Sequence, residues 1–258
     1  YGLKRVGIEE AYLTVARWQK MKIAFPADTE LVPAGKLLTE LRSAKTEEEL
    51  AVMQKAQDIT DQVFAEICEF LHAGVTESEV AAQLTYLQMK HGAEGNSFPP
   101  IVASGANGSM PHAIPTAKPI QKGEFVTMDF GCIYQGYCSD MTRTVAIGQP
   151  SDEMRRVYDA VLDAQLAGIA AAKAGVPGCD VHNAAWDVLK KYGYGDYFGH
   201  GFGHSLGIEI HESPNANRAN TKPLPAGAVL SAEPGVYLPG KFGVRTEDVM
   251  FLTETGNR

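Results

Sequence analysis

The sequence lacks the features that mark membrane proteins and nucleic-acid-binding proteins. No run of about 18 consecutive apolar residues occurs, which excludes a transmembrane helix. The first ten residues, YGLKRVGIEE, contain no apolar signal core. The formal net charge is −8, and this excess of acidic groups argues against nucleic acid or an anionic membrane as the main partner.

Cysteine is also scarce. The only cysteines are Cys68, Cys132, Cys138 and Cys179, and no two of them have the CxxC spacing that is typical of zinc and redox sites. Such a low density in a chain of 258 residues predicts reduced thiols in a cytoplasmic protein. The remaining composition, with 45% hydrophobic residues, is that of a globular protein with a sizeable core.

Capping signals and apolar spacing predict several helices. Thr46 and Thr76 are each followed three residues later by a glutamate, Glu49 and Glu79, which is the pattern of a capping box. Ser151 caps a third long helix. Further helices are expected over GIEEAYLTVARWQKMK and over 180–191. Segments rich in Val, Ile, Thr and aromatic residues predict strands at 98–104, 123–148, 228–233 and 243–252.

Residues 73–92 and 174–193 are similar at a constant offset of 101 residues. In each half, two predicted helices precede antiparallel strands. We interpret this order as a duplicated α+β domain with pseudo-twofold symmetry around an antiparallel sheet. Chance similarity between two helix-loop-helix segments is the alternative. The identical pairs are Ala73/Ala174, Gly74/Gly175, Val75/Val176, Val80/Val181, Lys90/Lys191 and Gly92/Gly193.

Four acidic residues lie inside apolar, strand-like runs, where carboxylates are rare unless they are paired or bind metal. If residues 133 and 136 close the first hairpin, two of the carboxylates face each other directly, and their repulsion is relieved by a cation. The other two flank PGVYLPGKFG and can oppose one another on the strands that leave it. The four are Asp129 in FVTMDFG, Asp140 in YCSDMTRTV, Glu233 in VLSAEPGVY and Glu247 in GVRTEDVMF.

His204, in GHGFGHSLG, lies between the two acidic pairs. His200 precedes it by four residues, which is the spacing of a helical zinc pair. The surrounding glycines disfavour a helix and indicate a strand whose backbone approaches its neighbours closely. Four carboxylates and one imidazole form a ligand set for two divalent cations, with Mn²⁺ favoured and Co²⁺, Fe²⁺ or Zn²⁺ as alternatives. Two such ions can support hydrolysis of an amide.

These segments resemble the pita-bread metallopeptidases, which include Xaa-Pro aminopeptidases, Xaa-Pro dipeptidases (prolidases) and methionine aminopeptidases. The resemblance covers residues 44–254, and MDFG, SDMTRT, GHGFGHSLGIEIHE, SAEPGVY and VRTEDV occur in the family's order. It implies the pita-bread (creatinase/aminopeptidase) fold and a homodimer in the full-length protein. The metal ligands it implies are Asp129, Asp140, His204, Glu233 and Glu247.

The same resemblance implies roles for further residues. SGANGSMPHAIPT is similar to the segment that holds the family's catalytic histidine, here His112. His112 and His211 are expected to donate hydrogen bonds to the substrate carbonyl or the tetrahedral oxyanion. Glu233 is expected to shuttle a proton as well as to bind metal. His200 and Arg245 are expected to bind substrate.

LRSAKTEEELAVMQKA and SFPPIVASGANGSMPH are more similar to the Xaa-Pro enzymes than to methionine aminopeptidases. The predicted activity is therefore hydrolysis of the Xaa-Pro bond, at the N-terminus of peptides or in dipeptides, and the sequence leaves these two open. Residues 1–44 are expected to be the remnant of an N-terminal creatinase-like domain plus a linker. Residues 45–258 are expected to be the catalytic domain, slightly truncated at its end.

Three alternatives remain. The first is an activity like that of methionine aminopeptidase. The second is a metal-free, creatinase-like amidinohydrolase, and the third is a catalytically silent binding module of the same fold. The complete ligand set counts against the last two.

Overall fold

The computed structural model describes residues 3–258 and divides the chain into two compact units, Tyr1–Arg42 and Ser43–Arg258. The small unit contains the parallel strands β1 (Arg5–Ile8) and β2 (Glu30–Pro33) and the helices α1 (Val15–Ala24) and α2 (Gly35–Arg42). The helix predicted over GIEEAYLTVARWQKMK was wrong at its start. Thr14 caps α1, and residues 5–8 pair with β2, a long-range contact that local spacing does not reveal.

The first half of the large unit runs from α3 to β8. Its helices α3 and α4 begin at the predicted capping boxes, which are confirmed: each threonine hydroxyl accepts from the N3 amide and each N3 glutamate accepts from the N-cap amide. Its elements are α3 (Glu47–Phe70), α4 (Glu77–Lys90), β3 (Gly95–Asn96), β4 (Ile101–Ser104), the 3₁₀ helix η1 (Gly105–Ser109), β5 (Phe125–Phe130), β6 (Cys132–Tyr134), β7 (Tyr137–Cys138) and β8 (Met141–Ala146).

The second half repeats this order of two helices followed by strands. Its first helix begins at the predicted cap, Ser151, whose hydroxyl accepts from the amide of Met154. The elements are α5 (Asp152–Ala171), α6 (Gly178–Lys191), the 3₁₀ helix η2 (Gly195–Tyr197), β9 (Gly203–Ser205), β10 (Glu212–Ala216), β11 (Val229–Ala232), β12 (Gly235–Leu238), β13 (Phe242–Arg245) and β14 (Asp248–Phe251).

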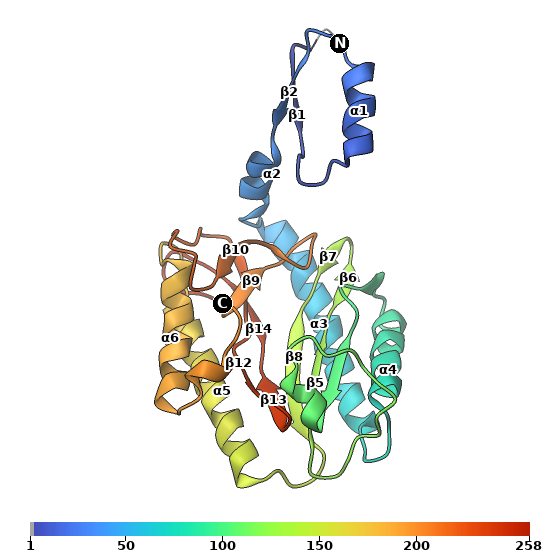
Figure 1. Cartoon of the computed structure of the whole chain (residues 1–258), viewed down its shortest axis with the longest axis vertical. Helices are drawn as coiled ribbons and strands as arrows, with labels where there is room; N and C mark the ends of the chain where they lie inside the picture. The colour runs from blue at the N-terminus through green and yellow to red at the C-terminus, as the bar shows by residue number, and fades with distance from the viewer. Residues whose placement is uncertain (1–2) are drawn as a thin grey trace. The chain divides into compact units, whose positions relative to one another are not determined.

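The strands of the large unit lie between the two helical pairs. In Figure 1, α3 and α4 lie on one side of these strands and α5 and α6 on the other. The strand pairings described within residues 43–258 are all antiparallel. Each half has its own apolar core: Val63, Leu84 and Val126 belong to the first, and Leu189 and Leu230 to the second. The predicted duplication around antiparallel strands is confirmed.

The register of the first hairpin differs from the prediction. Tyr134 and Tyr137 close the turn, and the two residues between them, Gln135 and Gly136, both have positive φ, at 47° and 77°. This is the geometry of a two-residue hairpin turn whose twist matches its strands. Asp129 therefore pairs with Thr142 and not with Asp140. Because the register moves by two residues, both aspartates stay on one face of the sheet as diagonal neighbours.

Among the described residues, no helix has the length and apolar composition that crossing a membrane requires.

Candidate metal centre

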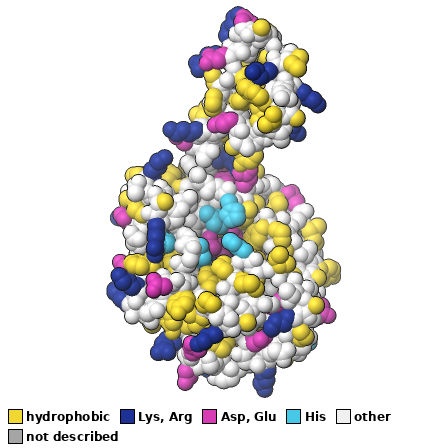
Figure 2. All heavy atoms as spheres, in the orientation of Figure 1, with side chains coloured by type: hydrophobic (Ala, Val, Ile, Leu, Met, Phe, Trp, Pro, Cys, Tyr) yellow, Lys and Arg dark blue, Asp and Glu magenta, His cyan; other side chains and the backbone are white. Residues whose placement is uncertain are grey.

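A cavity of about 350 Å³ in the large unit brings together every site residue that the sequence predicted. Figure 2 shows histidine side chains around a hollow in the surface, with acidic side chains behind them. Phe98, Ile101, Pro111 and Ile210 add apolar surface to the same cavity. The predicted residues that line it are His112, Asp129, Asp140, His200, His204, His211, Glu233, Arg245 and Glu247.

Strand pairing places the four carboxylates. Asp129 lies on β5, and Asp140 immediately precedes β8. In the second half, Ala232 pairs with Asp248 and Gly235 with Arg245. The residues between these pairs, Glu233 and Glu247, therefore oppose one another, as predicted. Asp248 points to the other face of its strand, where its carboxylate accepts from Arg143 at 2.7 Å.

His204 directs one ring nitrogen toward the carboxylates. Its Nε2 lies 3.2 Å from Glu233 Oε1 and 3.5 Å from Asp140 Oδ2. Nδ1 lies 3.1 Å from the carbonyl oxygen of Ser205. When Nδ1–H donates to this carbonyl, the lone pair of Nε2 is available to a metal ion. Ligand atoms of Asp140, His204 and Glu247 all lie within 4.8 Å of one another.

A neighbouring glycine permits this position of β9. A Cβ atom added at Gly203 would lie 1.8 Å from the carbonyl oxygen of Ser231 on β11. The amide of His204 donates to the Ser231 hydroxyl at 3.0 Å. This hydroxyl in turn donates to Glu233 Oε1 at 3.1 Å. The close backbone approach predicted from the glycine-rich sequence is confirmed, and it holds the histidine and the glutamate together.

The carboxylates have unmet bonding capacity that fits cations. Among residues 3–258, no group donates a hydrogen bond to the buried atoms Asp129 Oδ1 and Glu247 Oε1. Burial and the Glu247 carboxylate raise the pKa of Asp140 well above its ordinary value. Burial likewise raises the pKa of Glu233 to about 7. Buried, mutually repelling carboxylates without donors are stabilised by divalent cations, which carry the missing positive charge.

Arg245 binds one of these carboxylates directly. Its guanidinium donates from Nη2 to Asp129 Oδ2 at 2.6 Å, from Nε to the Thr142 hydroxyl at 3.0 Å and from Nη1 to the Tyr237 hydroxyl at 2.8 Å. Thr142 donates onward to Glu247 Oε2 at 2.7 Å. With 3% of its surface exposed, Arg245 is placed to orient carboxylates of both acidic pairs. Its predicted contact with substrate stays a prediction.

Sequence reasoning missed Tyr237 and Thr142. Both occur within quoted motifs, SAEPGVY and SDMTRT, but nothing in the local sequence indicates that their hydroxyls meet one arginine. The Tyr237 hydroxyl accepts from Arg245 and lies 2.9 Å from His200 Nε2, to which it can donate. Tyr237 on β12 thus links Arg245 on β13 to His200 in the loop before β9. Because these segments are separate in the sequence, the link becomes visible only in the fold.

Histidines around the cavity whose pKa is lowered are neutral at neutral pH. Burial lowers the pKa of His200 to about 4. Burial also lowers the pKa of His211, whose ring packs against that of His204 with centroids 4.4 Å apart. His112 lies on an exposed turn at the mouth of the cavity. Neutral imidazoles can donate a single hydrogen bond without adding positive charge.

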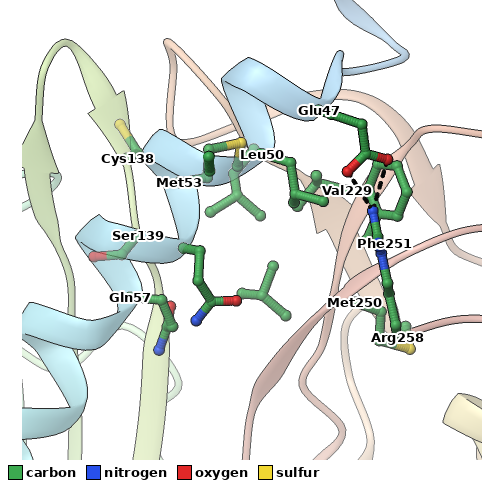
Figure 3. Close-up of a pocket in the computed structure, with 14 residues that line it drawn as sticks. Glu47, Leu50, Met53, Gln57, Cys138, Ser139, Val229, Met250, Phe251 and Arg258 are labelled. Atoms are coloured by element: carbon green, nitrogen blue, oxygen red, sulfur yellow. Dashed lines mark hydrogen bonds and ion pairs between the residues drawn. The ribbon is translucent and has the colours of Figure 1, made fainter.

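A second cavity, of about 400 Å³, lies between α3 and β14 (Figure 3). Leu50, Met53 and Phe251 are among its mostly apolar lining. At its edge, Glu47 forms an ion pair with Arg258 through contacts of 2.7 and 2.8 Å. Within the described part of the chain, its lining contains no histidine and a single carboxylate. The metal-ligating side chains in its lining are Glu47, which is paired with Arg258, and Cys138.

Comparisons with known proteins show which family the chain belongs to. The model of metallopeptidase family M24 matches residues 51–254. The uncharacterized peptidase YqhT of Bacillus subtilis is 43% identical over the whole chain, which covers 73% of that protein.

Two solved structures have the same fold. An Xaa-Pro dipeptidase from Bacillus anthracis has a TM-score of 0.96 and 41% identity, over 99% of this chain and 71% of that one. An X-Pro aminopeptidase from Thermotoga maritima MSB8 has a TM-score of 0.95 and 38% identity, over 99% of this chain and 72% of that one. The predicted pita-bread fold is thereby confirmed, and the chain belongs to metallopeptidase family M24.

Proposed function

We propose that this protein is a two-metal exopeptidase that hydrolyses the bond before proline, in dipeptides or at the N-terminus of peptides. The observation that carries the proposal is the convergence of two carboxylate pairs and His204 on one cavity. Two buried oxygens there, Asp129 Oδ1 and Glu247 Oε1, receive no hydrogen bond from any described residue. Specificity for proline is supported by relatives whose names carry it.

The ligands we assign to the two metal ions are Asp129, Asp140, His204, Glu233 and Glu247. Oxygen-dominated ligation favours Mn²⁺, with Co²⁺, Fe²⁺ or Zn²⁺ as alternatives. When bound, the ions supply Lewis acidity toward the substrate carbonyl and an activated water. The other roles in the reaction belong to side chains of this protein.

Glu233 is the proton acceptor in this proposal. Its carboxylate lines the cavity 3.2 Å from His204 Nε2, where it can accept a proton from a water molecule that enters the site. The Ser231 hydroxyl donates to Oε1 at 3.1 Å, and this hydrogen bond orients the carboxylate. The proton taken from water is then delivered to the nitrogen of the departing proline.

His112 and His211 stabilise the carbonyl oxygen as negative charge develops on it. Both line the cavity, and each can donate one N–H to an oxyanion. Because burial lowers the pKa of His211, its ring enters the reaction neutral and adds no charge that would repel the cations. The exposed turn that carries His112 lets this residue meet a substrate that enters from solvent.

The apolar part of the cavity is suited to the pyrrolidine ring. Phe98, Ile101 and Ile210 supply surface that gains by excluding water from a proline side chain. His200 lines the same cavity with both ring nitrogens engaged, Nδ1 at 2.8 Å from the Gly201 carbonyl and Nε2 at 2.9 Å from the Tyr237 hydroxyl. It therefore contributes its ring surface to the pocket for the residue after the cleaved bond.

We also propose a cytoplasmic location and a homodimer for the full-length protein. The four cysteines are free, as in proteins of reducing compartments. The proposal of a dimer rests on the family resemblance and is tested by the oligomeric state in solution.

A metal-titrated assay of the full-length protein on Ala-Pro, Ala-Pro-Ala and Met-Ala-Ser tests the activity. We expect cleavage of the two proline substrates and none after exhaustive chelation. Faster cleavage of Ala-Pro assigns the protein to the dipeptidases, and faster cleavage of Ala-Pro-Ala to the aminopeptidases. Cleavage of Met-Ala-Ser alone would overturn the assignment to proline, and full activity without metal would overturn the metal-dependent chemistry.

A further inference from the structure

Glu77 is a completely buried carboxylate that the chemistry above does not use. It lies in the first turn of α4 with 0% of its surface exposed, and it does not line the cavity of the metal centre. A buried carboxylate is costly unless hydrogen bonds replace its water. The groups that supply those bonds therefore indicate what this residue holds in place.

Three residues of one loop donate to the Glu77 carboxylate. Oε1 accepts from the amide and hydroxyl of Ser104, at 2.7 and 2.8 Å. Oε2 accepts from the amide and hydroxyl of Thr116, at 3.1 and 2.6 Å. The side-chain amide of Asn107 donates to both oxygens, at 3.1 and 3.0 Å. Hydrogen bonds from neutral groups to a charged acceptor are shorter and stronger than those between neutral groups.

These bonds keep the carboxylate charged. Burial alone would raise the pKa of Glu77, but the bonds from Thr116 and Ser104 outweigh burial and leave the pKa below its ordinary value. The N-terminal end of α4 adds favourable partial positive charge. The interaction is therefore present throughout the neutral pH range.

The loop that Glu77 holds, residues 104–116, carries His112 between its two fixed ends. A turn presents the histidine, with the amide of Ala113 donating to the Met110 carbonyl at 3.2 Å. The opposite side of the loop packs against β13, where a Cβ atom at Gly243 would lie 1.9 Å from the Gly108 carbonyl oxygen. The loop is thus fixed between α4 on one side and β13 on the other.

The corresponding position in the second half shows that the repeat does not require a carboxylate here. At the offset of 101 residues, Glu77 corresponds to Gly178. The amide of Gly178 donates to the Lys222 carbonyl at 3.3 Å, and a Cβ atom there would lie 2.4 Å from the Asn215 carbonyl oxygen. At this position α6 therefore meets its loop through backbone atoms, and the carboxylate of α4 serves a need of the first half.

We propose that Glu77 is a positioning residue for His112: its carboxylate ties both ends of the loop 104–116 to α4 and so fixes the imidazole at the mouth of the metal centre. The inference rests on the proposed role of His112 in the reaction. It assigns no contact between Glu77 and substrate or metal.

The Glu77→Gln variant tests this proposal because it keeps the size of the side chain and removes the charge. The NH₂ group of the glutamine would face an N–H or O–H donor whose hydrogen bond the carboxylate oxygen now accepts. We expect kcat on Ala-Pro to fall about 10- to 100-fold, the scale of a small displacement of a catalytic group. KM and bound metal should stay near the wild-type values. The matched control is Glu79→Gln in the same helical turn, an exposed residue of the capping box, which should leave kcat unchanged.

A double-mutant cycle separates positioning from a general loss of structure. In a His112→Ala background, Glu77→Gln should lower kcat by less than about twofold, because the residue through which it acts is gone. Thr116→Val, at an exposed position, should give a smaller loss that also disappears in the His112→Ala background. If the losses of kcat in the single variants multiply in the double variants, the positioning role is wrong.

The outcomes also separate this inference from the proposed function. If the wild-type protein fails to cleave Ala-Pro with metal present, the proposed function is wrong. If the wild type cleaves Ala-Pro and Glu77→Gln retains full kcat, the proposed function stands and the positioning role is wrong.

Discussion

The two halves of the large unit share one scaffold but supply different groups to the cavity. The first half contributes Asp129, Asp140 and His112, and the second contributes two glutamates, three histidines and an arginine. Glu77 and Gly178 occupy equivalent positions at the start of the second helix of each half. Glu77 binds its loop through a carboxylate, whereas Gly178 contacts its loop through backbone atoms. The repeated strands thus place the carboxylate pairs, whereas the loops, which do not repeat, give the two sides of the cavity different chemistry.

The difference extends to the caps of the helices. Helix α4 begins with a capping box, whereas α6 begins after Pro177 without a side-chain cap. Both helices nevertheless start beside a loop that approaches the cavity. A duplicated fold can therefore keep its core and its strand pairing while each half evolves its own way of holding a loop.

Removing one carboxylate from each half should have the largest effect. Asp140→Ala and Glu247→Ala should each lower kcat on Ala-Pro at least about 10³-fold, since a two-metal centre needs both halves to hold its ions. Bound metal measured by atomic absorption should fall in both variants. An Asp140→Ala variant with substantial activity would refute the two-metal account.

Arg245 joins the two halves, and its replacement should come next in size. Arg245→Lys keeps the charge but cannot donate to Asp129, Thr142 and Tyr237 together. We expect a loss of about 10- to 100-fold in kcat or in metal affinity, as is typical for partners of metal ligands. Arg218→Lys, whose guanidinium stacks on Trp186, is the control and should retain activity. Equal losses in the two variants would contradict the assigned role.

A side chain at Gly178 should disturb stability in the second half. Gly178→Ala places a Cβ atom 2.4 Å from the Asn215 carbonyl oxygen, and we expect the free energy of unfolding to fall by about 1–3 kcal/mol. Gly95→Ala is the control in the first half, since a Cβ atom there meets nothing within 4 Å. Urea denaturation measures both. If the two variants lose the same stability, close backbone packing at α6 is not the cause.

The smallest predicted effect concerns pH and the metal-free protein. The pKa of Glu233 is about 7 in the fold against an ordinary value of 4.5, so its protonated form is favoured by folding. The stability it contributes is complete below pH 4.5 and is lost as the pH rises through 7. The Tm of metal-free protein should therefore fall by a few degrees over this range. Mn²⁺ should raise Tm more at pH 7 than at pH 5, and a metal effect that grows toward low pH would contradict this.

Local signals in the sequence predicted the parts of the fold that depend on neighbouring residues. The capping boxes at Thr46 and Thr76 and the apolar spacing after them fix two helix starts. The predicted hairpin register was wrong because the turn lies one residue later than expected, at Gln135-Gly136, where both residues adopt positive φ. The error left both aspartates on one face of the sheet, since a shift of two residues preserves the alternation.

Long-range contacts explain what the sequence could not reveal about the site. The motifs named the residues around the cavity, but the links from Arg245 to Tyr237 and Thr142 join segments about a hundred residues apart or on different strands. The same holds for Glu77, which looks like one of several glutamates in a helical turn. Only the fold shows that its carboxylate is buried against the loop of His112.

Anomalous diffraction from crystals grown with Mn²⁺ tests the central claim most directly. The account predicts two manganese ions in each chain, both held between the carboxylate pair of the first half and that of the second, with His204 bound to one of them. A single ion, or no ion among Asp129, Asp140, Glu233 and Glu247, would contradict it.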